Sequence, residues 1–245
     1  MRPSRLATLL AVLLALVFAG VAPASAQSPR DPYQRLVDAI ASDTISGLVF
    51  DRDMQVGFEA GLRMDPEVAA NEAECPGLIT GLRTAVTPVM RKSHELDYQW
   101  YRAELEQLFR RTMSESEAAG AADFFATDLA QRFLATAIAQ TSAENALKEA
   151  LGTDEVTLSE EAYAADKRET TMRTMQAMNP EDLKQFTSRM AEAAWFPTFA
   201  SIGPQISELG LAMGNRDFTP QHGAEFDEAA EAFSIAHFDK CEAGD

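Results

Sequence analysis

A helix start, an apolar face and an aromatic pair meet in residues 114–137, SESEAAGAADFFATDLAQRFLATA. Ser114 and Glu117 have the spacing of a capping box, in which a serine hydroxyl and a glutamate carboxylate satisfy free amides of the first helical turn. Three apolar side chains then recur at intervals of four and share one helical face: Phe125, Leu129 and Phe133. Phe124 lies about 100° around the helix and widens that face. The stretch predicts an amphipathic helix whose Phe124-Phe125 pair belongs to the core; lining of a ligand site is the alternative.

Similar helix signals occur on both sides of this stretch. Four good N-cap residues stand directly before a proline suited to the first helical turn: Asp31-Pro32, Asp65-Pro66, Asn179-Pro180 and Thr219-Pro220. Thr157 and Glu160 repeat the capping-box spacing. Two stop signals are present: Gly152 and Gly214-Asn215. Segments 114–140 and 179–205 share a weak similarity, which two amphipathic helices built by the same rules explain more simply than an old duplication.

These signals predict an all-α protein with a single multi-helix, bundle-like domain over residues 27–245. The expected helices cover residues 31–43, 45–62, 65–73, 77–112, 114–150, 157–178, 179–213 and 219–240. A proline inside a helix removes a hydrogen bond and clashes with the preceding turn, so we expect Pro88 to interrupt the fourth helix. For the same reason, Pro197 and Pro204 should kink or split the seventh helix.

Residues 1–26 have the features of a secretory signal peptide. Arg2 and Arg5 precede an apolar run over residues 6–21. Small residues at the end, Ala24-Ser25-Ala26, predict cleavage after Ala26 and a periplasmic or secreted protein. An uncleaved membrane anchor is the alternative, but the apolar run is short for a spanning helix. No later segment is apolar enough to span a bilayer, so we expect no transmembrane segment in the mature chain.

The chain is strongly acidic, with 38 Asp and Glu residues against 21 Lys and Arg residues and a formal net charge of −17 at pH 7. Loss of Arg2 and Arg5 with the leader would make this charge about −19. Such a surface repels nucleic acid phosphates and anionic lipid head groups, so we expect no nucleic acid partner. It is compatible with a cationic partner, a neutral ligand or simple solubility.

Cys75 and Cys241 are the two cysteines of the chain. An even pair in an exported protein favours a disulfide, which here would tie the C-terminus to the turn at Cys75-Pro76-Gly77. Closing so long a loop is worth ~4–5 kcal/mol in the chain-entropy model. Two free thiols are the alternative. A redox role is disfavoured because the chain has no C-x-x-C motif.

Residues 101–140 combine a hydrophobic pair, a hydroxyl residue, an acidic group, an aromatic pair and a basic position: Leu108-Phe109, Ser114, Glu115 to Glu117, Phe124-Phe125, Thr127 and Arg132. This arrangement resembles domain of unknown function 2059, a bacterial envelope family whose members are mostly exported and helical. That family usually follows its aromatic pair with Ser-Pro-x-Gly-Gln, where this chain has Thr127-Asp128-Leu129-Ala130-Gln131. The resemblance implies an exported helical bundle, and it carries over no catalytic residue.

The sequence contains no complete motif for a common catalytic or metal site. Its three histidines form no H-E-x-x-H motif, and neither G-x-S-x-G nor S-x-x-K is present. Asp51-Arg52-Asp53 begins like a calcium loop, but Val56 and Leu62 stand where glycine and glutamate are required. Paired carboxylates on helices of this composition are most often solvated. We therefore predict no catalytic residue, metal site or cofactor.

The segment Trp195-Phe196-Pro197-Thr198-Phe199 places three aromatic residues beside a helix-breaking proline. Methionines lie nearby in the sequence, and adaptable methionines with rigid aromatic rings can line an apolar groove. We therefore predict Trp195, Phe196 and Phe199 as ligand-binding residues; a kinked core helix is the alternative.

The combined features favour a non-enzymatic envelope protein that binds another protein or a small apolar ligand. An envelope hydrolase using carboxylate or histidine chemistry is the competing hypothesis, and a purely structural or stress-related protein is a third. The sequence does not indicate an oligomeric state.

Overall fold

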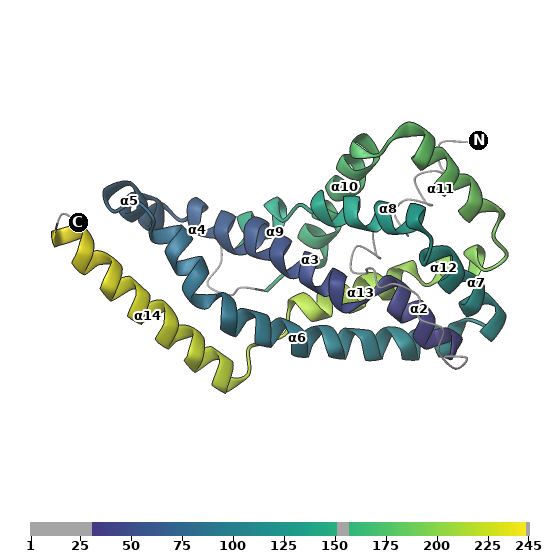
Figure 1. The fold of residues 1–245 in the computed structure, drawn as a ribbon, viewed down its shortest axis with the longest axis horizontal. Coiled ribbons are helices and arrows are strands. Elements are labelled where there is room, and N and C mark those ends of the chain that lie inside the picture. Colours follow the sequence, from purple (N-terminus) through teal and green to yellow (C-terminus); the bar gives the residue numbers. More distant parts are fainter. Residues whose placement is uncertain (1–30, 151–156, 244–245) are drawn as a thin grey trace.

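The computed structural model describes residues 31–150 and 157–243, which form helices joined by short connections (Figure 1). The fold class is all-α, as predicted, since none of these residues lies in a strand. The predicted leader, residues 1–26, and the predicted stop signal Gly152 lie outside the described residues.

The helices follow one another closely along the chain. In order they are α2 (Pro32–Ile40), α3 (Asp43–Asp53), the π-helix η1 (Met54–Glu59), α4 (Ala60–Met64), α5 (Pro66–Glu74), α6 (Leu78–Thr112), α7 (Glu115–Phe125), α8 (Asp128–Ala139), α9 (Glu144–Ala150), α10 (Glu160–Ala177), α11 (Pro180–Glu192), α12 (Phe196–Ser201), α13 (Gly203–Gly214) and α14 (Pro220–Ala243). Residues 45–50, which are rich in β-branched and apolar side chains, lie within α3 and are helical.

The predicted caps explain where several helices begin. All four predicted N-cap side chains accept a hydrogen bond from an amide of the first turn, and each is followed by proline: Asp31, Asp65, Asn179 and Thr219. Ser114 and Glu117 form the predicted capping box at the start of α7. The start of α10 differs from the prediction, because Ser159 rather than Thr157 caps this helix.

The predicted helix 114–150 is divided into α7, α8 and α9. Thr127 has an extended backbone between α7 and α8, and its hydroxyl accepts a hydrogen bond from the amide of Ala130 at 3.3 Å. Thr127 therefore caps α8 and separates it from α7. Phe125 is fully buried in the last turn of α7, and Phe124 packs beside it against the core. The core interpretation of this aromatic pair is confirmed.

Pro197 and Pro204 divide a helix as predicted, whereas Pro88 does not. Pro197 and Pro204 lie in the first turns of α12 and α13, so the predicted helix 179–213 is split into α11, α12 and α13. The prediction for Pro88 is wrong, because α6 continues through this residue. α6 bends along its course instead of ending (Figure 1), which is the usual response of a helix that retains an internal proline.

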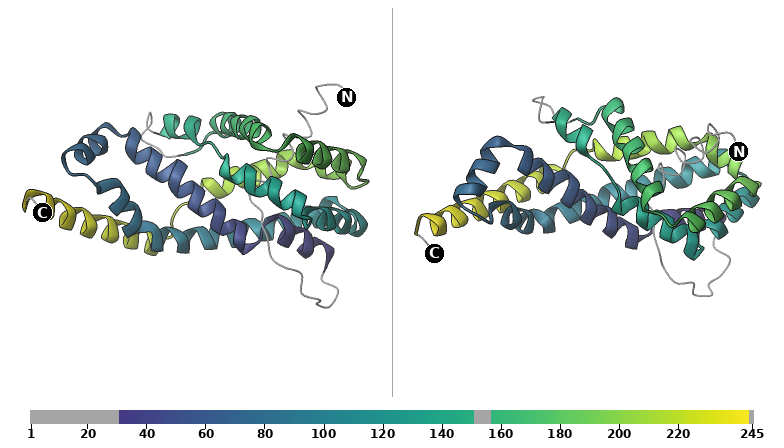
Figure 2. Two further views of the ribbon diagram at one scale, coloured as in Figure 1. Left: turned by 45° about the horizontal axis from the view of Figure 1, so that its top comes forward. Right: turned by 90° about the horizontal axis from the view of Figure 1, so that it is seen from above.

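One main hydrophobic core unites most of the helices into a single domain. It takes buried side chains from α2, α3, α6, α7, α8, α11, α12 and α13. Aromatic rings in mutual contact form its centre: Phe109, Phe125, Phe133, Phe186 and Phe199. α6 runs along most of the length of the molecule and serves this core with its C-terminal half (Figure 2). A smaller cluster beside Pro88 contains Phe50, Met54, Val86 and Val89.

α14 forms an arm that packs against α6 at one end of the molecule (Figure 1). The Phe233 ring lies so close to Gly81 that it leaves no room for a Cβ at this position. Farther along the arm, Cys75 and Cys241 lie at disulfide distance, with Cα atoms 5.8 Å apart across a sequence separation of 166. The structure therefore brings together the two cysteines that were predicted to pair.

Candidate functional site

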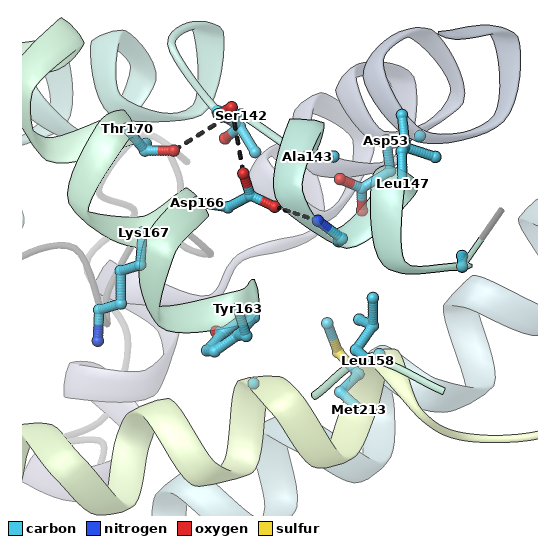
Figure 3. Close-up of a pocket in the computed structure, with 16 residues that line it drawn as sticks. Asp53, Ser142, Ala143, Leu147, Leu158, Tyr163, Asp166, Lys167, Thr170 and Met213 are labelled. Carbon is cyan, nitrogen blue, oxygen red and sulfur yellow. Dashed lines mark hydrogen bonds between the residues drawn. The ribbon is translucent and has the colours of Figure 1, made fainter. Parts of the chain in front are cut away.

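A pocket of about 350 Å³ lies where α9 and α10 meet η1 and α13 (Figure 3). Its wall is mainly apolar, with a small number of polar groups. The lining residues that matter for its chemistry are Asp53, Gly57, Leu147, Leu158, Tyr163, Asp166, Lys167 and Met213. We refer to this space as the α9–α10 pocket.

Asp166 fixes α9 against α10 and so builds one wall of the pocket. Its carboxylate accepts hydrogen bonds from the Asn145 amide at 2.9 Å, the Asn145 side chain at 2.8 Å and the Ala146 amide at 2.9 Å. The Ser142 hydroxyl donates to it at 3.4 Å. Every α-helix leaves its first backbone amides without intrahelical partners. In α9, the Asp166 carboxylate of α10 accepts from two of them, those of Asn145 and Ala146. One turn along α10, Thr170 accepts from the Ser142 amide at 2.9 Å.

The π-helix η1 forms the opposite wall. It directly follows Asp53 and contains Gly57, and both residues line the pocket. A Cβ placed on Gly57 would have no neighbour within 4 Å, so the space beside it is open. Single-turn π-helices are rare and occur frequently at functional sites.

Asp53 ends α3, and its carboxyl lies in the pocket (Figure 3). Asp53 retains exposed surface and lines the pocket beside apolar side chains. Desolvation by the surrounding protein raises the pKa of Asp53 to about 7, against a smaller lowering by the Arg52 guanidinium. Arg52 donates to the Thr141 carbonyl at 2.8 Å and to Gln55 at 3.0 Å. Within the described ranges, the Asp53 carboxyl has no hydrogen bond and no ion pair.

Tyr163 and Lys167 lie on α10 and complete the polar part of the pocket. Burial raises the pKa of Tyr163 to about 12, and the negative charge of Asp53 adds to this rise. Burial lowers the pKa of Lys167 to about 8. The Lys167 ammonium donates to the hydroxyl of Ser207 on α13. Its side chain extends away from Leu158, which lies on the other side of α10 (Figure 3).

A second hollow, of about 500 Å³, lies between α3 and α6 and is more polar. Within it, His94 Nε2 lies 3.0 Å from the Ser46 hydroxyl and 3.1 Å from the Ser46 carbonyl. Burial lowers the pKa of His94, which favours the neutral imidazole. Arg91 and Arg102 also line this hollow, and each is already paired with a carboxylate: Asp51 for Arg91, and Asp38 for Arg102.

The residues predicted from sequence as ligand-binding lie in the main core. Phe199 is fully buried in α12 and Trp195 is 5% exposed just before it, while Phe196 is partly buried against the same cluster. The Trp195 ring centroid lies 5.4 Å from that of Phe124 and 5.7 Å from that of Phe125. None of the three lines the α9–α10 pocket or the second hollow. Their role in ligand binding stays a prediction.

Sequence reasoning did not identify Asp53, Asp166 or Lys167 as site residues. Asp53 comes to the pocket because the end of α3 lies beside the segment before α9, where Arg52 donates to the Thr141 carbonyl, and no local pattern encodes that contact. The signal that was available is on α10, where the acidic Asp166 shares a helix face with Ala162, Thr170 and Thr174. A charge on an otherwise small and buried face indicates a partner across the interface.

In residues 31–150 and 157–243, no group of three or more His, Cys, Asp or Glu side chains is arranged to hold a metal ion. Over the same ranges, no helix combines the length and the apolar character needed to cross a membrane.

Comparison with known proteins gives one match. A family described as "uncharacterized protein conserved in bacteria", domain of unknown function 2059, matches residues 102–155. This stretch covers the end of α6 together with α7, α8 and α9, and it agrees with the resemblance found over residues 101–140. No curated protein and no solved structure matches the chain. From the end of α6 to the α9 wall of the pocket, the chain is therefore similar to this bacterial family.

Proposed function

We propose that this protein is exported and binds a small, mainly apolar molecule in the α9–α10 pocket without transforming it. The observation that carries the proposal is the pocket of about 350 Å³, with its mainly apolar wall and few polar groups. Small-molecule sites are typically concave, roughly 300–1,000 Å³ in volume, and lined by apolar side chains with a few placed polar groups.

The way the pocket is held open supports this proposal. One wall depends on Asp166, which accepts three hydrogen bonds from α9 and one from Ser142 just before it. The other wall is the π-helix η1, which leaves open space beside Gly57. A hydrophobic core normally closes such spaces, because packing at interior density is favourable. A maintained apolar space between two well-anchored walls is what a ligand site requires.

Export is supported by the sequence features of residues 1–26 and by the cysteine pair at disulfide distance. Disulfides persist in oxidising compartments outside the cytoplasm. The test is N-terminal sequencing of the protein isolated from an envelope fraction of an expressing bacterium. A chain that begins at Gln27 supports export, whereas a chain that retains Met1 in the cytoplasm contradicts it.

The binding proposal is tested by native mass spectrometry of the purified protein before and after denaturation. A small molecule that is present in the native protein and lost on denaturation is the expected result. Gly57→Leu would fill the pocket and should abolish this extra mass. Gly223→Leu is the matched control, since Gly223 also has no neighbour within 4 Å of a Cβ position and lies on α14, outside the pocket. Equal retention of the molecule by both variants would contradict the proposal.

The hydrolase hypothesis has one observation in its favour, the contact between Ser46 and His94. His94 Nε2 is almost as close to the Ser46 carbonyl, to which a neutral imidazole donates its proton. The backbone amides of Ile45 and Ser46 both donate to the Ser42 carbonyl, so neither is free to stabilise an oxyanion beside the Ser46 hydroxyl. Binding is therefore the better supported function.

A further inference from the structure

We propose that the molecule held in the α9–α10 pocket carries a protonated amine that pairs with Asp53. This inference rests on the proposed binding function and specifies the chemical class of the ligand. It follows from which polar groups of the pocket are already satisfied and which are still available.

Asp166 is not available to a ligand. Its two carboxylate oxygens accept hydrogen bonds from Ser142, from two groups of Asn145 and from the Ala146 amide. Displacing these donors would leave the start of α9 without partners. Asp166 therefore builds the pocket wall rather than recognising its occupant.

The two positive side chains near the pocket donate to neutral acceptors outside its apolar part. Lys167 donates to Ser207, and Figure 3 shows its side chain directed away from Leu158 and Met213. Arg52 donates to the Thr141 carbonyl and to Gln55. Neither side chain makes an ion pair within the described ranges, but a ligand lying against Leu158 and Met213 would be away from the Lys167 ammonium, and an anionic one would face the charge of Asp53.

Asp53 and Tyr163 remain as the available polar groups. In the described ranges, no hydrogen bond is made by the Asp53 carboxyl or by the Tyr163 hydroxyl. A protonated amine donates up to three hydrogen bonds and is attracted to a carboxylate and to an aromatic ring. Leu147, Leu158 and Met213 offer apolar surface for the remainder of such a molecule. The excess of acidic residues over the whole chain favours the approach of a cation.

The experiment compares three probes with the same ten-carbon tail: decylamine, decanol and decanoic acid. Affinities are measured by titration calorimetry at about pH 8, where a primary alkylamine is protonated as lysine is. Decylamine should bind about tenfold more tightly than decanol, since a charge-assisted hydrogen bond is stronger than a neutral one. Decanoic acid should bind most weakly.

Two variants assign this preference to Asp53. Asp53→Asn should remove the advantage of decylamine over decanol while decanol affinity is retained. Asp51→Asn makes the same charge change two positions earlier, at a residue paired with Arg91 outside the pocket, and should leave the advantage intact. Asp53→Asn keeps the size of the side chain and removes a carboxyl that makes no hydrogen bond within the described ranges, so loss of folding is not expected.

The outcomes separate this inference from the proposed function. Equal binding of the three probes, or tightest binding of decanoic acid, overturns the amine inference while the pocket still binds. Loss of the preference for decylamine in Asp51→Asn to the same extent as in Asp53→Asn also overturns the amine inference. The preference would then come from the overall negative charge of the protein rather than from Asp53. If no probe binds, or if Gly57→Leu leaves binding unchanged, the proposed binding function itself fails.

Discussion

The indole of Trp195 lies against Gly120 of α7, so closely that a Cβ at position 120 would stand 2.9 Å from Trp195 Cδ1. Trp195 is buried among the aromatic rings of the core and has little room to retreat. The contact between α7 and the segment before α12 therefore depends on the absence of a side chain at Gly120.

Gly120→Ala should lower the free energy of unfolding by about 1–3 kcal/mol, the usual cost of overpacking a core. Urea denaturation at neutral pH measures this change. Gly223→Ala is the control, because a Cβ there meets nothing within 4 Å, and it should be neutral or stabilising by about 0.4–1 kcal/mol. Similar denaturation midpoints for the two variants would show that the Trp195 side chain shifts to accept a Cβ at position 120 without loss of stability.

Asp166→Ala should destabilise the protein because the first amides of α9 lose their acceptor. The cost expected for unsatisfied buried donors is about 1–3 kcal/mol each, with partial relief from water. Asp166→Asn, which keeps one carbonyl oxygen, should fall between the wild type and the alanine variant. Asp182→Ala is the comparison, since Asp182 pairs with Arg132 at the surface and such pairs contribute about 0–1 kcal/mol. An Asp166→Ala variant as stable as Asp182→Ala would contradict the assigned capping role.

Asp53 should make the stability of the protein depend on pH in a defined direction. The pKa of Asp53 is about 7 in the folded protein, against an ordinary value of 3.8 that applies to the unfolded chain. Between pH 3.8 and pH 7, the Asp53 carboxyl is therefore protonated in the folded state and ionised in the unfolded state. Stability contributed by this group is therefore present at low pH and lost as pH rises toward 7. Asp53→Asn should be more stable than the wild type at about pH 8 and no more stable near pH 4. Thermal unfolding at both pH values, with Asp51→Asn as reference, measures the difference; a gain that is equal at both pH values would refute the assignment.

Ser46 should not behave as a catalytic serine. Incubation with a fluorophosphonate, which labels activated serines, should leave the intact mass of the protein unchanged. The reason is that His94 shares its Nε2 between the Ser46 hydroxyl and the Ser46 carbonyl. Labelling of the wild type that disappears in Ser46→Ala would revive the hydrolase hypothesis and move the functional site to the second hollow.

Reduction of the Cys75–Cys241 pair should loosen α14 while the main core stays folded. α14 contacts chiefly α6, and His222 is its one described residue that is buried. Amide hydrogen exchange in a peptide from residues 220–243 should become faster in Cys75→Ser. Exchange in residues 98–109 of α6, which serve the main core, should be unchanged. Equal acceleration in both peptides would mean that the arm and the core unfold together.

Helix boundaries were well predicted where the determinant is local in sequence. Asp65 and Asn179 cap the helices that follow them because a short side chain reaches its own next turn. Thr127 does not stand out as a cap in the sequence, because neither a following proline nor a glutamate three positions later marks it as they mark the predicted helix starts. Pro88 was predicted to break α6, but Val86 and Val89 on either side are buried against α3 and η1. That burial offsets the hydrogen bond lost at the proline.

The pocket could not be predicted from the sequence because it depends on contacts between distant segments. Asp53 and Tyr163 are separated by several helices, and each is unremarkable in its own segment. The predicted aromatic residues Trp195 and Phe199 share the composition of a ligand groove, but composition does not distinguish a groove from a filled core. Packing density, which the sequence does not specify locally, separates the two cases.

The α14 arm is attached at both of its ends. The peptide chain holds its beginning to α13, and the cysteine pair holds its end beside Cys75. When the arm detaches from α6, both tethers keep its effective concentration near α6 high, so it rebinds the same molecule. Exchange of α14 between two copies of the chain, the route by which terminal helices produce domain-swapped dimers, would require that the sulfur–sulfur link be opened first. The pairing of Cys75 with Cys241 thus protects the protein against domain swapping for as long as its surroundings are oxidising.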